Sequence, residues 1–330
     1  MSRRRSVLAA VALLLIAGCG GDPGSAVGSV GGSGATTGGS SGADPGWRWE
    51  SFGGIELQVP KEWGNGTSGV AGYGAWCADR GGGAPSPGVN RGPLALMPAI
   101  ACPEDRPADS YAAGVDLGTF PPFARRELAG SWAVEAVEVA GVSVAVTSDD
   151  PEQMAQVTAS VRPVQDGIDV HGCPVDSELR QEGSRPVARS GPPGVPGPAE
   201  VVAVSACRYL LPGSTEDLPH PLLASTLLQG ADAAALIEEV VAAPPGSGPD
   251  DDSSCAASTR LGEELVVLRV DDGTGVDEVH EVVVRYSGCG GHGVDDGTTA
   301  RRLTGGLLQQ LFVGPLAPTT LAGVVARLTS

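Results

Sequence analysis

The first nineteen residues constrain this chain most, because they decide the environment in which everything after them folds. Arg3 to Arg5 form a positive start, and an apolar run from Val7 to Ile16 follows. This run is too short to cross a bilayer as a stable helix, and the small residues Ala17 and Gly18 behind it are typical of the cleavage point of a removable signal. The pattern therefore predicts export.

The end of the signal predicts a lipid anchor. The tetrad Ile16-Ala17-Gly18-Cys19 resembles the lipobox of bacterial lipoproteins. The resemblance implies that the Cys19 thiol is diacylated, that the signal peptide of residues 1–18 is cut off in front of it, and that the protein stands on the extracytoplasmic face of the cell membrane. A plain secretory signal with an incidental cysteine is the alternative.

Composition favours a globule rich in strands and turns. Only 4% of the 330 residues are aromatic and 18% are charged, whereas there are 50 glycines and 27 prolines. The formal net charge is -18, and removal of the signal makes the chain more acidic still. A phosphate-binding basic face is not expected, so nucleic acid is a poor partner, and the acyl chains, not charge, must hold the protein to the membrane.

The cysteines predict disulfides. Apart from Cys19 the chain has an even set: Cys77, Cys102, Cys173, Cys207, Cys255 and Cys289. An exported protein meets an oxidising environment, so we expect three disulfides, and we favour pairing each cysteine with its neighbour in sequence. A metal site is the competing interpretation. It is disfavoured because no two of these cysteines have the close C-x-x-C spacing of structural zinc.

Shifts in composition predict four segments: the signal peptide at 1–18, the lipidated Cys19 with a flexible Gly/Ser linker at 19–46, a Trp-containing α+β domain at 47–165, and a second α+β domain at 166–330. All five tryptophans lie between residues 47 and 132, which indicates two cores with different packing. We expect an α+β fold class: two small antiparallel-sheet domains, each with a C-terminal amphipathic helix, stapled by disulfides.

Several elements are predicted from residue periodicity in the first domain. Alternation over 55–59 indicates a half-buried strand, and 137–139 and 142–146 predict two strands that turn at Ala140-Gly141. Asp150 is expected to cap a helix that ends before Pro163.

In the second domain, strands are predicted at 201–211, 222–228, 265–270, 279–286 and 299–303, the last as an edge strand. One helix is expected to begin at the cap Asp232 and to bury Leu236, Ile237, Val240 and Val241. Another is expected after the cap Thr304, burying Leu307, Leu308, Leu311 and Phe312.

No catalytic, cofactor-binding or metal-binding residues are predicted. The four histidines, His171, His220, His280 and His292, have no nucleophile elbow near them in sequence, and His280-Glu281 lacks the second histidine of an H-E-x-x-H motif. The acidic turns 271–273 and 295–297 suit hairpins better than calcium.

Trp47, Trp49, Trp63 and Trp76 suggest an aromatic platform for sugars or peptide stems, with a simple core role as the favoured alternative. Asn65-Gly66-Thr67 fits a turn better than a glycosylation site.

Scattered short motifs carry a family resemblance over most of the chain. They include Trp49-Glu50-Ser51-Phe52-Gly53-Gly54, Gly172-Cys173-Pro174, Cys207-Arg208-Tyr209, Val284-Arg285-Tyr286-Ser287-Gly288-Cys289 and Asp295-Asp296-Gly297-Thr298. The chain is similar in these to a group of actinobacterial secreted lipoproteins that have no assigned function. The resemblance implies an envelope location and no particular activity.

These observations favour a non-catalytic binding or interaction module at the cell envelope, with an envelope protein or cell-wall component as its partner. The alternative is a cell-wall or peptide hydrolase without a recognisable motif. A solute-binding lipoprotein is disfavoured because such proteins alternate strands and helices in two lobes, and few long helical patterns occur here.

Overall fold

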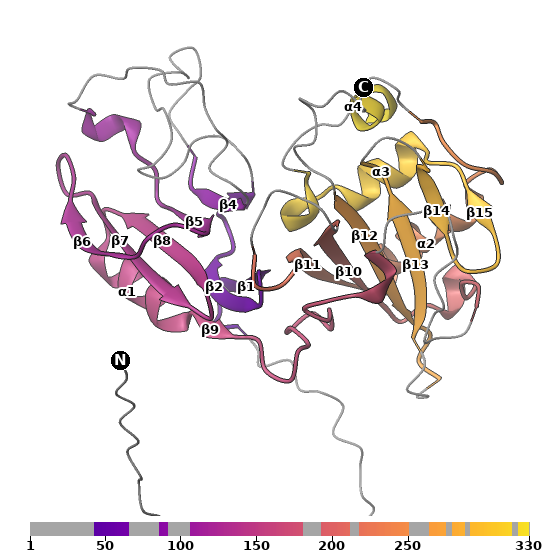
Figure 1. The fold of residues 1–330 in the computed structure, drawn as a ribbon, viewed down its shortest axis with the longest axis horizontal. Helices are drawn as coiled ribbons and strands as arrows, with labels where there is room; N and C mark the ends of the chain where they lie inside the picture. The colour runs from indigo at the N-terminus through magenta and orange to yellow at the C-terminus, as the bar shows by residue number, and fades with distance from the viewer. Residues whose placement is uncertain are drawn as a thin grey trace, which may run out of the picture. The chain divides into compact units, whose positions relative to one another are not determined.

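The computed structural model describes residues 43–65, 86–91, 106–180, 193–211, 218–250, 264–274, 279–287, 291–318 and 323–329. Strands dominate these residues and form three sheets accompanied by a few helices, which confirms the α+β class (Figure 1). Residues 1–42, with the signal, Cys19 and most of the linker, lie outside the described residues. The division into domains at residue 165 stays a prediction.

A three-stranded sheet opens the described chain, with the order β1 (Trp47–Phe52), β2 (Ile55–Pro60) and β9 (Arg162–Pro163). Gly53 and Gly54 turn β1 into β2 with φ angles of 60° and 94°, a conformation that favours glycine. The strand predicted at 55–59 is confirmed, but its alternating burial is wrong. Glu56 is buried, and its carboxylate is compensated there: Nη2 of Arg162 lies 2.6 Å from its Oε1 and the amide of Val170 donates to its Oε2.

The second sheet is mixed, which corrects the expectation of antiparallel sheets only. Its strands run in the order β3 (Gly64–Asn65), β4 (Gly88–Arg91), β5 (Gly114–Gly118), β8 (Val142–Ser148), β7 (Ala133–Val139) and β6 (Phe123–Glu127). The pairs β3-β4 and β4-β5 are parallel, and the remaining pairs are antiparallel. The predicted turn between β7 and β8 is confirmed, with positive φ at Ala140 and Gly141.

Helix α1 (Pro151–Ser160) follows β8 as predicted. The Asp150 carboxylate accepts hydrogen bonds from the backbone amides of Glu152 and Gln153, so the predicted cap is confirmed. Met154 and Val157 are buried against β8 and β2. One helix face thus completes the core of the first two sheets.

The third sheet is wholly antiparallel. Its order is β11 (Leu222–Gln229), β10 (Ala203–Leu210), β12 (Glu264–Asp271), β13 (His280–Arg285), β14 (Gly293–Asp295) and β15 (Ala300–Arg301). All five strands predicted in this region are present within a few residues, and β15 lies at the edge as expected.

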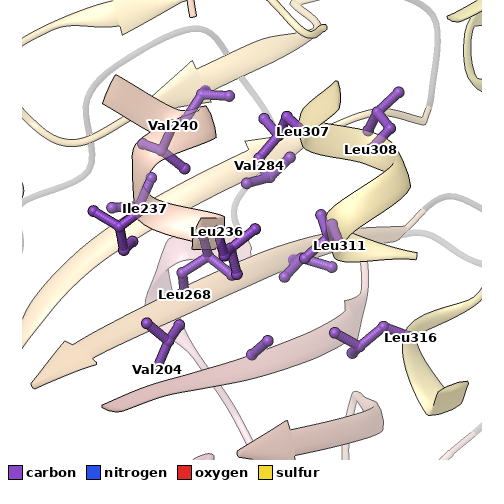
Figure 2. Packing of buried hydrophobic residues seen from close by; sticks show 14 of the residues in the cluster. Val204, Leu236, Ile237, Val240, Leu268, Val284, Leu307, Leu308, Leu311 and Leu316 are labelled. Atoms are coloured by element: carbon purple, nitrogen blue, oxygen red, sulfur yellow. The ribbon is translucent and has the colours of Figure 1, made fainter. Parts of the chain in front are cut away.

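Helices α2 (Gly230–Ala242) and α3 (Gly305–Leu311) share an apolar core with this sheet. Figure 2 shows the side chains that meet there: Leu236, Ile237 and Val240 of α2, Leu307, Leu308 and Leu311 of α3, and Val204, Leu268 and Val284 of the strands. None of the helices in the described residues is long and apolar enough to span a bilayer.

Two details of these helices differ from the prediction. Gln229, not Asp232, is the N-cap of α2, and its side chain makes no capping bond. Val241 is 44% exposed, because it lies off the stripe that faces the sheet. The predicted Thr304 cap of α3 is confirmed, because the Thr304 hydroxyl accepts a hydrogen bond from the amide of Leu307, and a further helix, α4 (Gly323–Thr329), follows.

The Cys173–Cys207 disulfide confirms one predicted pair. It joins β10 to a turn after β9, and Tyr209 donates to the carbonyl of Pro174 beside it, 2.7 Å away. Both cysteines belong to a separate buried apolar cluster with Tyr209 and Leu265. The other predicted pairs, Cys77 with Cys102 and Cys255 with Cys289, lie outside the described residues.

Candidate functional site

A cluster of buried polar side chains lies where β4 pairs with β5. Asn90 of β4 and Asp116 of β5 are register partners on these parallel strands, and the amide Nδ2 of Asn90 donates to Oδ1 of Asp116 over 2.7 Å. Asp116 is 6% exposed. Its Oδ2 and the Oδ1 of Asn90 are buried and have no hydrogen-bond partner among the described residues.

The positive charge of Arg106 lies near enough to Asp116 to oppose the rise of its pKa. Arg106 lies just before the short 3-10 helix η2 (Ala108–Ser110), where its Nε donates to the Ser110 hydroxyl and its Nη2 donates to the Ser110 carbonyl. These two bonds fix the guanidinium plane. The third nitrogen, Nη1, is buried and has no partner within the described part of the chain.

Burial and charge act against each other at Asp116. Burial raises the pKa of Asp116 to about 6, although the hydrogen bond from Asn90 and the charge of Arg106 both oppose the rise. Burial lowers the pKa of Arg106, opposed by Tyr111 and Asp116. An arginine nevertheless keeps its proton at neutral pH. At neutral pH the cluster therefore holds one carboxylate and one guanidinium, with no net charge.

Aromatic rings border the cluster on the Arg106 side. The guanidinium carbon of Arg106 lies 4.1 Å from the centre of the Tyr111 ring, and Tyr111 stacks on Trp132 with 5.7 Å between ring centres. Tyr111 is buried, whereas Trp132 is half-buried. Asn90, Asp116, Arg106, Tyr111 and Trp132 are called the Asp116 site below.

The chemistry of the Asp116 site suits recognition of a polar group. Asn90 and Asp116 each have one open acceptor oxygen, and Arg106 has one open donor nitrogen. A metal ion is a poor occupant, because a guanidinium repels cations and only two oxygen ligands are on offer. A ligand that both donates and accepts hydrogen bonds fits this set.

Sequence reasoning missed this site, although a signal was present. Asp116 lies in the middle of the short strand sequence Gly-Val-Asp-Leu-Gly, and Asn90 lies in Gly-Val-Asn-Arg. A polar residue at the centre of a fully buried strand demands a partner. What the sequence did not show is that β4 and β5 are neighbours.

A second polar cluster joins Asp169, Ser225 and His171. The Ser225 hydroxyl donates to Oδ2 of Asp169, and Nδ1 of His171 lies 2.8 Å from the same hydroxyl. In a hydrolytic triad the histidine stands between the acid and the serine. Here the serine is in the middle and is completely buried.

The role of this second cluster is structural. Oδ1 of Asp169 accepts hydrogen bonds from the amides of His171 and Cys173, at 3.0 and 2.8 Å. The carboxylate thereby shapes the turn that carries the disulfide, and Ser225 attaches the turn to β11. These contacts hold His171 in place between the turn and β11.

The remaining histidines also have partners in the fold. Nδ1 of His280 lies 3.1 Å from the Gly194 carbonyl, and Nδ1 of His292 lies 3.0 Å from the Pro249 carbonyl. His220 lies against the β1-β2 turn, where its ring occupies the space that a side chain on Gly54 would fill. None of them adjoins the Asp116 site in the contacts that the described residues make.

The acidic turns favour the hairpin interpretation over calcium. The Asp271 and Asp295 carboxylates each accept a bond from the glycine amide two residues on, at 2.8 and 2.7 Å. Burial alone would raise the pKa of Asp296, but hydrogen bonds from Thr298, Arg301 and Thr299 lower it to about 2. In the described ranges no three acidic, histidine or cysteine side chains gather as metal ligands.

The tryptophans predicted as a platform are placed differently. Trp63 is 3% exposed and belongs to the apolar core, in agreement with the favoured alternative of a simple core role. The guanidinium of Arg162 lies 4.2 Å from the centre of the Trp49 ring. Trp47 packs partly buried against the same core, and Trp76 lies outside the described residues.

A shallow, open depression of about 370 Å³ lies beside the edge strand β6. Its walls include Phe123, Arg125 and Val137. The edge is bulged and charged, with Arg125 paired to Glu127 at 3.0 Å, and both features discourage the addition of another strand. The Asp116 site is the better candidate because its polar atoms still need partners.

Comparisons of the chain with protein-family models, curated proteins and solved structures find no match.

Proposed function

We propose that this protein is a membrane-anchored extracytoplasmic lipoprotein and acts at the cell envelope as a non-catalytic binding module. Lipid on Cys19 attaches it to the membrane, and the Gly/Ser linker up to residue 46 lets the folded part reach outward. A linker of this composition behaves as a flexible coil.

The observation that carries the binding role is the set of open polar atoms at the Asp116 site. Each of Asn90, Asp116 and Arg106 has one buried polar atom without a partner among the described residues. A buried polar group left in that state costs about 1–3 kcal/mol. A fold that retains such unpaired groups does so at a net cost in stability, and a ligand that pairs with them would remove that cost.

A hydrolase is the second candidate, and one feature favours it. Burial raises the pKa of Asp116 to about 6, and perturbed carboxyl groups are frequent in active sites. Asp116→Asn separates the two functions, since the amide keeps an acceptor oxygen but cannot take up a proton. A binding module should retain most of its function in this variant, whereas a hydrolase that uses Asp116 as a base should lose it.

Complementation of a deletion strain tests the proposal. Asp116→Ala and Arg106→Ala should fail to complement at normal protein abundance, and so should Cys19→Ala. Asp109→Ala and Arg125→Ala are the matched controls, because both side chains are exposed. Full complementation by Asp116→Ala would exclude the site. Loss of complementation on replacing a single histidine in a folded protein would instead support the hydrolase.

A further inference from the structure

The chain passes from its first two sheets to its third near residue 165, and the two halves on either side share an apolar core. The first half (residues 43–165) contains the first two sheets, and the second half (residues 166–329) contains the third. Leu210 of β10 and Leu223 of β11 nevertheless lie buried in the cluster around Phe52 and Ile55, whose other buried members all belong to the first half. The core of the first half therefore includes two side chains from the second.

The start of β11 is joined to the turn between β1 and β2. The backbone amide of Gly53 donates to the carbonyl of Leu222 over 2.6 Å. Leu218, just before this strand, packs partly buried against the first-half cluster. A backbone hydrogen bond and an apolar contact thus link the same segment of the second half to the first.

Two turns of the first half approach this segment so closely that a side chain on either turn would crowd it. A Cβ atom on Gly54 would overlap the ring of His220, and one on Gly141 would lie 3.0 Å from Cγ of Pro219. Both glycines also have positive φ angles, which other residues rarely adopt. The β1-β2 turn and the β7-β8 turn are therefore packed closely against residues 219 and 220.

Buried charges also meet across the two halves. Burial lowers the pKa of Arg91 in β4, the charge of Glu50 opposes this, and the positive charge of Arg208 in β10 lowers the pKa further. Arg208 is 1% exposed, and its Nε lies 3.6 Å from Oε2 of Glu264. Each arginine therefore pairs with a carboxylate of its own half, and the two buried pairs lie close enough to interact.

The short 3-10 helix η6 (Gly314–Leu316) touches both halves. It contacts β10 and β11 of the third sheet and also β3 of the second sheet. Leu316 is fully buried in the core of the second half, and the carbonyl of Ala317 accepts a hydrogen bond from Nη1 of Arg208 over 2.6 Å. This segment therefore bridges the boundary between the halves.

We propose that the two halves form one rigid, cooperative body, in place of two domains that fold and move independently. Domains within a chain move relative to each other unless their interface is large and apolar. Here apolar side chains, a backbone hydrogen bond and the η6 segment all cross the boundary. A partner therefore meets one fixed surface, and binding does not proceed by closure of two lobes about residue 165. The inference is independent of what the Asp116 site binds.

The position of the tryptophans allows one half to be followed by itself. All five lie between residues 47 and 132, so their fluorescence reports only on the first half. Leu236→Ala in α2 removes a side chain that is buried in a cluster made only of second-half residues (Figure 2). In urea unfolding of the full chain in detergent, this variant should lower the midpoint of the fluorescence transition by about 1 M, and the midpoint of far-UV circular dichroism equally.

Matched variants and a second measurement support this test. Val241→Ala is the control, because Val241 lies on the same helix but is 44% exposed, and it should leave both midpoints in place. Ile237→Val is a smaller change in the same core and replaces Leu236→Ala if that variant does not fold. In scanning calorimetry the unmodified protein should unfold in a single transition whose calorimetric and van't Hoff enthalpies agree.

The result that overturns the proposal is a fluorescence midpoint that stays in place while the circular dichroism curve separates into two transitions. Two calorimetric transitions would lead to the same conclusion, namely that the halves unfold independently. Neither result bears on the proposed binding function. That function is tested by complementation with Asp116→Ala and Arg106→Ala at normal protein abundance, whether or not the halves unfold together.

Discussion

Glu50 and Arg91 form an ion pair that is almost completely withdrawn from water, although they lie on strands of different sheets. Nη2 of Arg91 donates to Oε2 of Glu50, and Arg48 holds the other oxygen of Glu50 at 2.7 Å. The side chains of Arg91 and Glu50 are 3% and 0% exposed. Burial lowers the pKa of Arg91, and the charge of Glu50 opposes this. The pair therefore ties β1 to β4, next to the candidate site.

Breaking this pair should destabilise the protein strongly. Glu50→Gln leaves the buried Arg91 charge without its counter-charge, and we expect a loss of about 3–5 kcal/mol in the free energy of unfolding. Glu127→Gln is the control, because it breaks an exposed pair with Arg125 that contributes about 0–1 kcal/mol. Urea unfolding of both variants measures the difference, and equal losses would contradict a structural role for the Glu50–Arg91 pair.

Stability should depend on pH through Asp116. Its pKa is raised from 3.8 to about 6 in the folded state, so the folded protein holds this proton more tightly than the unfolded chain. The resulting stabilisation is fully present below about pH 4 and is lost as the pH rises through about 6, a total of about 3 kcal/mol.

Asp116→Asn isolates this contribution. The difference in unfolding free energy between the variant and the unmodified protein should shift in favour of the variant between about pH 4 and pH 7. Urea unfolding across this range measures it. Asp109→Asn, at an exposed position of η2, should follow the unmodified protein. A constant difference for Asp116→Asn across the range would show that this carboxyl titrates normally.

Local sequence patterns predicted the helices and strands but not the contacts between residues that are far apart in sequence. The β7-β8 hairpin and α1 follow from alternation, a turn and a cap within a few residues of one another. Asn90 and Asp116 are 26 residues apart and meet only because β4 pairs with β5 in parallel, which no local pattern indicates. The alternation over 55–59 likewise predicted an exposed Glu56, because nothing near it in sequence shows that Arg162, 106 residues away, pairs with its carboxylate.

Two of the three predicted helix caps, Asp150 and Asp232, give a direct comparison. Asp150 accepts two backbone hydrogen bonds at the start of α1, so Asp150→Ala should cost about 1 kcal/mol. Asp232 lies in the first turn of α2 but is not its cap, so Asp232→Ala loses only its interaction with the helix dipole, a few tenths of a kcal/mol. Urea unfolding measures the loss of unfolding free energy in the two variants. A larger loss for Asp232→Ala than for Asp150→Ala would mean that the Asp232 carboxylate caps α2.

Cys19 should carry the lipid anchor. The intact mass of the mature protein should correspond to a chain that begins at Cys19 and bears acyl groups. Cys19→Ala should leave the protein unprocessed or release it from membranes, because the acidic folded part has no affinity of its own for an anionic surface. An unmodified Cys19 in the mature chain would refute the anchor.

The Cys173–Cys207 disulfide should contribute more to stability than any other interaction that holds the turn carrying Cys173. The bridge closes a loop with a sequence separation of 34, for which chain entropy predicts about 3–4 kcal/mol. The double variant Cys173→Ala/Cys207→Ala should lose this amount in urea unfolding.

Tyr209→Phe is the comparison, because it removes only the bond to the Pro174 carbonyl, worth about 1 kcal/mol. The two alanines also remove buried sulfur from an apolar cluster, which adds to the loss. If the double variant loses no more than Tyr209→Phe, the turn is held by its hydrogen bonds and the bridge is dispensable.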